Sequence, residues 1–220
     1  MGGVLYSSLT FTFPSTALYF SHKVLFNYSI ELPVGRGKRI LRNAPAAVDK
    51  LVGGWRLAGT TIFRSGQPVQ VYTPSGAVGG LGSQWYNIGM GRNNRPVAVP
   101  GQTLGMTTDG HAALMGSANF QYYMNPSAFR LTQGWEIGDV PSAYSNWRGP
   151  GFSQWDLALM KETTLGSESR RLQLRFESQN LFNHMNAGQP DGGVTNLTFG
   201  MISTQSGLPR RVMLAAKLLF

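Results

Sequence analysis

The chain combines an ordinary hydrophobic content with few charges. Of its 220 residues, 42% are hydrophobic and 13% are charged, and 28 are Gly and 12 are Pro. Soluble domains average about 25% charged residues, and this composition excludes both a disordered polyampholyte and a Leu-rich helical bundle. The absence of cysteine excludes a disulfide scaffold, a thiolate metal site and a cysteine nucleophile.

The net charge of +9, from 19 Lys and Arg against 10 Asp and Glu, favours anionic partners such as nucleic acid, lipid headgroups or lipopolysaccharide. Arg36, Lys38, Arg39 and Arg42 share one short segment, whereas most other basic residues are scattered. No RNP-like motif, zinc-finger spacing or basic recognition helix accompanies them. We interpret the cluster as one basic turn, and nucleic-acid binding is not expected.

Helices that cross a membrane are not expected either. No stretch approaches the roughly 18 uninterrupted apolar residues that such a helix needs. The segment Met1-Gly2-Gly3 lacks the basic and apolar regions of a signal peptide, so direct secretion of this chain as written is not expected.

Six segments alternate apolar and polar residues at period 2 for about ten residues, the length of a tilted membrane-spanning strand. In the clearest segment, Leu172, Leu174 and Phe176 point to one face, and Arg175 and Glu177 to the other. Soluble strands usually span five or six residues, so the pattern favours a transmembrane antiparallel barrel. In chain order, the expected strands lie near 4–13, 22–33, 55–64, 154–165, 171–182 and 210–220.

The segment 34–54, between the second and third expected strands, carries the basic cluster and a short helix. Asn43 is its expected N-cap, Val48 and Leu51 share one face, and Gly53-Gly54 is its expected stop. We interpret it as a solvated helix-turn.

The remaining connections are unequal, as in outer-membrane barrels. The residues 166–169 form an expected tight turn, whereas 66–153 and 184–209 are long, polar and rich in Gly, Asn and Pro. If the chain ends on the periplasmic side, both long loops fall outside and the tight turn falls inside. Two aromatic girdles then follow: Phe63, Trp155 and Phe182 mark the outer interface, and Trp55 and Phe220 the inner one.

A series of weaker motifs occurs in a fixed order along the chain. They are 28–38 (YSIELPVGRGK), 53–68 (GGWRLAGTTIFRSGQP), 94–96 (NRP), 123–129 (YMNPSAF), 148–152 (RGPGF) with Trp155-Asp156, 175–184 (RFESQNLFNH) and the last strand to Phe220. Together they resemble the C-terminal β-barrel region of TonB-dependent outer-membrane receptors that carry an N-terminal carboxypeptidase-regulatory-like domain. The resemblance covers most of the chain.

The resemblance implies a 22-stranded barrel, plugged by an N-terminal domain, that imports a scarce large substrate with energy passed through the TonB protein. Phe220 resembles the signal that the barrel assembly machinery reads. The implied surroundings are outer-membrane lipid and lipopolysaccharide, and TonB would act only through a plug region that this chain lacks.

About six strands are fewer than the eight of the smallest closed membrane barrels. Open edges cannot sit in hydrocarbon, because each unpaired backbone group there costs several kcal/mol. We therefore expect an incomplete barrel, the C-terminal fragment of a longer receptor in which Met1 is an internal or mis-called start. In one alternative, 69–73 and 120–129 add two strands and close a small independent barrel. In another, the strands form a soluble β-sandwich that acts as an interaction module.

The polar face of the strands is expected to line the barrel lumen. Its members, here called the polar-face set, are Lys23, Asn27, Glu31, Arg64, Arg171, Arg175, Glu177, Gln179 and Lys217. Mixed signs favour cross-strand pairs worth about 0.2–1 kcal/mol each, so a structural role is favoured over substrate contact. In the long outer loop, Trp135, Tyr144 and Trp147 are candidate ligand contacts, although the same aromatics would equally pack the loop on itself.

Enzyme chemistry is not expected. His22, His111 and His184 are far apart in the sequence, and none stands four residues from another His or a carboxylate, so a zinc site is not indicated. The run 35–38 lacks the spacing of a phosphate-binding loop. No nucleophile elbow and no acid–base carboxylate pair is recognisable, and no cofactor is implied.

Overall fold

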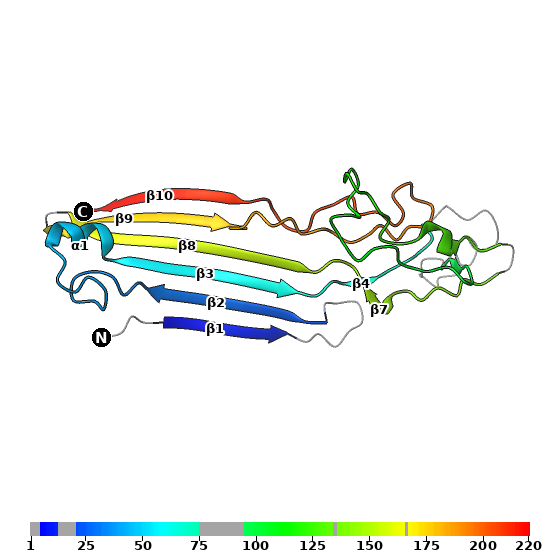
Figure 1. Cartoon of the computed structure of the whole chain (residues 1–220), viewed down its shortest axis with the longest axis horizontal. Helices are drawn as coiled ribbons and strands as arrows, with labels where there is room; N and C mark the ends of the chain where they lie inside the picture. The colour runs from blue at the N-terminus through cyan, green and yellow to red at the C-terminus, as the bar shows by residue number, and fades with distance from the viewer. Residues whose placement is uncertain (1–4, 13–20, 75–94, 134–135, 166) are drawn as a thin grey trace.

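The computed structural model describes residues 5–12, 21–74, 95–133, 136–165 and 167–220. Its main feature is one six-stranded antiparallel sheet in the order β1-β2-β3-β8-β9-β10, drawn as the long arrows of Figure 1. The strands are β1 (Leu5–Thr12), β2 (Lys23–Glu31), β3 (Trp55–Arg64), β8 (Phe152–Leu165), β9 (Ser167–Gln179) and β10 (Arg211–Leu219). The prediction of an incomplete antiparallel barrel of six strands is confirmed, because this sheet does not close.

The strand ends differ from the predicted ranges where the backbone turns. β8 and β9 extend to the pair Leu165–Ser167, so the connection is tighter than the predicted turn at 166–169. β9 ends at Gln179 and not at 182, because Asn180 adopts a left-handed φ of 49° that breaks the extended chain.

The register gives the sheet one apolar and one polar face. Ile30, Leu57, Leu159, Phe176 and Leu214 occupy consecutive paired positions across five strands. In the described part of the chain, nothing packs over the strand nearest the C-terminus: all nine residues of β10 are exposed, and Leu214 is 77% exposed. A β-sandwich would bury this face against a second sheet, so the β-sandwich alternative does not fit.

The buried core lies outside this sheet. It is formed by the two long loops, and its members are Val69, Val71, Ala113, Tyr123, Met124, Ala128, Phe129, Val140, Ala187, Phe199 and Ile202. We call this set the loop core. Figure 1 shows the segments that carry it gathered beyond one end of the sheet. Burial of these side chains, and not membrane contact, stabilises the folded loops.

Short strands inside the loops do not extend the main sheet. β4 (Pro68–Val69) pairs with β7 (Tyr144–Arg148), and β5 (Val97–Ala98) pairs with β6 (Phe129–Arg130), in two separate small sheets. A 3₁₀ helix, η2 (Pro126–Ala128), precedes β6. The expectation that 69–73 and 120–129 would complete an eight-stranded barrel is therefore wrong, because their hydrogen bonds are made within the loops.

The single α-helix of the described residues, α1 (Ala46–Val52), lies at the opposite end of the sheet. Pro45 occupies its N-cap position without a side-chain cap, so the prediction of Asn43 as N-cap is wrong. Gly53 follows as the C-cap, as expected, and its N–H donates to Asp49 O. In the described ranges, no helix has the length and hydropathy needed to cross a membrane.

Candidate functional site

The register places the whole polar-face set on one face of the sheet. Lys23 is paired with Arg64, and Asn27 with Thr60. On the other side of the sheet, Gln179 is paired with Arg211 and Lys217 with Gln173. Because paired residues share a face, strands far apart in the sequence contribute to one continuous polar surface.

Hydrogen bonds connect this surface across its strands. Thr60 Oγ1 donates to Asn27 Oδ1 at 2.8 Å, and Asn27 Nδ2 donates to Ser8 Oγ at 3.3 Å, so one chain of bonds joins β3, β2 and β1. Each of these three side chains is hydrogen-bonded to the next. Such a chain of hydrogen bonds is typical of a sheet whose own side chains make it rigid.

Several charged residues of the polar-face set form ion pairs. Arg171 contacts Glu162 of the neighbouring strand at 3.2 Å, and Lys38 contacts Glu31 at 3.0 Å. Arg175 pairs with Glu177 on the same strand. All these side chains are partly exposed, and exposed pairs contribute about 0–1 kcal/mol each. These pairs hold charged side chains of the polar face against one another.

A shallow hollow of about 380 Å³ lies in the middle of the polar face. Its floor includes Ala58 and Ala158, which are paired with each other and leave space that larger side chains would fill. Asp156 stands at its edge and accepts hydrogen bonds from Gln154 Nε2 at 2.9 Å and from the Asn180 N–H at 2.9 Å. The hollow therefore offers carboxylate and amide groups to a polar molecule.

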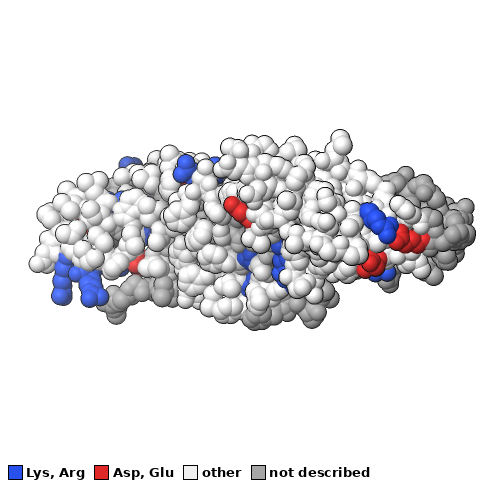
Figure 2. Space-filling model, turned by 45° about the vertical axis from the view of Figure 1, so that its right-hand side comes forward, with Lys and Arg blue, Asp and Glu red and all other residues white. Residues whose placement is uncertain are grey.

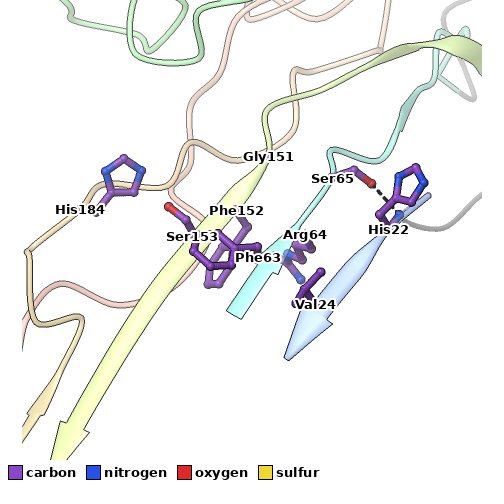
Figure 3. A pocket seen from close by; sticks show the side chains of 9 residues that line it. All are labelled: His22, Val24, Phe63, Arg64, Ser65, Gly151, Phe152, Ser153 and His184. Atoms are coloured by element: carbon purple, nitrogen blue, oxygen red, sulfur yellow. Dashed lines mark hydrogen bonds between the residues drawn. The ribbon is translucent and has the colours of Figure 1, made fainter. Parts of the chain in front are cut away.

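A second hollow, of about 370 Å³, lies where the sheet meets the loops. Figure 3 shows its lining residues, which are His22, Val24, Phe63, Arg64, Ser65, Gly151, Phe152, Ser153 and His184. The Arg64 guanidinium lies 4.3 Å from the centroid of the Phe152 ring and donates to Ser206 Oγ at 2.9 Å. This lining holds one guanidinium and two imidazoles, and it suits an anionic or neutral polar group.

Folding brings two distant histidines together. The ring centroids of His111 and His184 are 6.0 Å apart, although the strands from β6 to β9 lie between them in the sequence. Among the described residues, no three His, Asp or Glu side chains are grouped so that they could hold a metal ion.

Two of the three aromatic loop residues named from the sequence pack on the loop core. Tyr144 and Trp147 make a T-shaped contact with centroids 5.5 Å apart, and both are partly buried against the core. Burial, with the charge of Asp139, raises the pKa of Tyr144. Trp135 lies outside the described residues. Tyr144 and Trp147 thus contribute to packing within the loop.

Tyr123 is an aromatic residue of the long loop that was not among the candidate ligand contacts. It is 1% exposed, its O–H donates to Arg148 O at 2.6 Å, and burial raises its pKa to about 12. A buried hydroxyl with a partner fixes the position of the chain around it. The sequence signals for Tyr123 were its place in the motif at 123–129 and among the aromatic residues of the long loop.

The outer aromatic residues form one contact series on the apolar face. Trp155 makes edge contacts with Phe63 at 5.1 Å and with Phe182 at 5.3 Å between centroids. Phe182 lies in the turn after β9 and not within a strand. At the other end, Phe220 follows β10 and is 96% exposed.

Comparison with known families agrees with this architecture. The family model described as an outer membrane beta barrel domain matches residues 15–213. Searches of curated proteins and of solved structures gave no match. The matched range includes β2, β3, β8 and β9 and both long loops. The chain therefore belongs to the outer membrane beta barrel domain family, and its location is the outer membrane.

Proposed function

We propose that this chain forms the C-terminal wall of a TonB-dependent receptor, which imports a scarce large substrate through a plugged barrel. The observation that carries the proposal is the open sheet: β1 and β10 each have one edge without a partner strand in the described structure. A wall of this kind needs further strands before it can sit in hydrocarbon. A large receptor barrel supplies them from the same polypeptide.

The loops support the same proposal. Long extracellular loops are the part of such barrels that meets a substrate first, and here they are folded around a core and not merely extended. The hollow beside Arg64 lies directly below them, at the entrance to the polar face. The motif series from 28 to 220 adds the sequence resemblance to receptors of this type.

Binding to TonB is the direct test. The full-length protein that contains this chain, purified from outer membranes in detergent, is titrated with the purified periplasmic domain of TonB from the same cell. We expect saturable binding, with a porin from the same membrane as the negative control. Binding no stronger than that of the porin would contradict TonB-dependent import.

Conductance separates a plugged receptor from a passive channel. In a planar bilayer, a plugged barrel should give no steady open current at low voltage, whereas a small open barrel conducts continuously. A steady ohmic current from the full-length protein would favour the channel and would contradict the proposal.

A further inference from the structure

The helix α1 is fastened to the apolar face of the sheet by a buried lysine. Lys161 is paired with Trp55 on one side and Leu174 on the other, which places it among apolar residues, and it is 5% exposed. Its Nζ donates to Leu51 O at 3.0 Å and to Gly53 O at 2.6 Å. Trp55 Nε1 donates to the same Leu51 O at 3.1 Å. The end of α1 therefore lies against the surface that faces lipid.

The basic turn is held beside this helix. The Arg36 N–H donates to Asp49 Oδ1 at 2.5 Å, and Lys38 is paired with Glu31 at 3.0 Å. Both contacts restrict a segment of exposed backbone that would otherwise be free to move away from α1. The position of the basic residues relative to the membrane is therefore set by the fold.

Four cations of this region point to solvent. Within the described ranges, no carboxylate lies at ion-pair distance from the side chains of Arg36, Arg39, Arg42 or Lys50, and all four residues are exposed. In Figure 2, Lys and Arg side chains project at the end of the molecule that carries α1. At this end, Glu31 is paired with Lys38 and Asp49 accepts from the Arg36 backbone N–H, so the four guanidinium and ammonium groups are left to interact with an external anion.

Exposed apolar side chains are interleaved with these cations. Ile40 is 50% exposed, Leu41 49%, Val48 39% and Leu51 73%. Basic residues combined with exposed aliphatic residues on a short segment are typical of surfaces that lie at the boundary between headgroups and acyl chains. We call the cations and these apolar residues together the inner-rim surface.

A large apolar hollow adjoins the inner-rim surface on the lipid-facing side. It measures about 600 Å³, and its lining includes Trp55, Leu159, Leu174, Phe176, Leu214 and Ala216, with Arg175 and Ala215 of the neighbouring positions. The small Ala216 is paired with Leu174, which is also paired with Lys161. Leu174 therefore connects the hollow to Lys161, the residue that holds α1. The apolar lining of the hollow can accept a hydrocarbon chain.

We infer that this end of the sheet is a binding site for an anionic glycerophospholipid of the inner leaflet. The phosphate lies on the cations of the inner-rim surface, and one acyl chain lies in the hollow beside Ala216. The long loops place the opposite end of the sheet at the outer side, where lipopolysaccharide lies. Each Lys or Arg close to such a lipid surface contributes about fivefold in affinity. The inference does not depend on import or on TonB.

The test measures lipid binding by the full-length protein in detergent, by native mass spectrometry with added phosphatidylglycerol or phosphatidylcholine. We expect preferential binding of phosphatidylglycerol. The variant R39Q/R42Q should weaken that binding roughly 25-fold, the product of two factors of about five. The matched control R210Q/R211Q removes two exposed cations at the other end of β10 and should leave binding unchanged.

A second variant examines the hollow. Ala216→Phe should fill it and weaken phosphatidylglycerol binding, whereas Leu218→Phe, on the same face but outside the hollow, should not. The heat-dependent gel shift of folded barrels checks that every variant is folded. Equal binding of both lipids, equal loss in both double variants, or an unchanged affinity of Ala216→Phe would overturn the inference.

Discussion

Truncation of Ile202 tests whether the loop core is a cooperative unit. Ile202 is 0% exposed, its N–H donates to Ala113 O at 2.9 Å, and its own carbonyl accepts from the Met115 N–H at 2.8 Å. These contacts join the two long loops. Ile→Ala at a fully buried position lowers the free energy of unfolding by about 2–5 kcal/mol. Leu197, in the same loop, is 98% exposed, so Leu197→Ala should lower it by less than about 0.5 kcal/mol.

Amide hydrogen exchange of the folded protein in detergent measures the local opening free energy directly. A loss of about 3 kcal/mol raises the exchange rate of the Ile202 and Met115 amides on the order of a hundredfold, since about 1.4 kcal/mol corresponds to tenfold. Amides in β8 and β9 should be unaffected, because the strands do not contain the core. Equal exchange in Ile202→Ala and Leu197→Ala would refute the claim that the loop core stabilises the loops.

Three further outcomes are expected. In lipid nanodiscs, a membrane-impermeant maleimide should label R175C and not L174C, because the two positions lie on opposite faces and the chain has no other cysteine; equal labelling would contradict the faces. Tyr123→Phe removes the donor to the partly buried Arg148 carbonyl and should destabilise the loops by about 1 kcal/mol in the same exchange assay; unchanged exchange would contradict this. Hydrogen bonds from the Arg130 side chain and the Gln133 N–H lower the pKa of Glu136 to about 2. The stabilisation from this ion pair is therefore complete above pH 4.5 and is lost as the pH falls towards 2. An NMR titration midpoint near 4.5 for Glu136 would contradict this.

The membrane strands could be predicted because their cause is local. Alternation at period 2 is visible in any single strand, and it fixed both faces before any pairing was known. The end of β9 could not be read in the same way. The apolar–polar alternation continues up to residue 182, but Asn180 and Asn183 adopt left-handed φ values of 49° and 52°. Asn tolerates this conformation but also occurs in strands, so its presence alone does not mark the strand end.

The loop core could not be predicted, because its causes are distant in the sequence. Met115 and Ile202 meet through backbone hydrogen bonds across more than eighty residues of chain, and neither loop has a periodic pattern that would indicate burial. For the same reason, the sequence left ligand contact and packing within the loop as equal alternatives for Trp147, which packs against the core. A loop that is folded around a core and a loop without a core can have the same amino-acid composition.

Lys161 was missed for a different reason. A charge at a position that alternation assigns to the apolar face contradicts the pattern, and its compensation by Leu51 O and Gly53 O is visible only once α1 is placed. Buried cations need such partners. A charged residue that interrupts an otherwise apolar face is therefore a useful signal of a docked segment.

The arrangement of the loop core has a consequence for the order of assembly. Its residues come from the segments between β3 and β8 and between β9 and β10, so all four strands must be in place before the core can close. A sheet that has formed can therefore precede its loop core, and until that core closes both loops remain open to proteases.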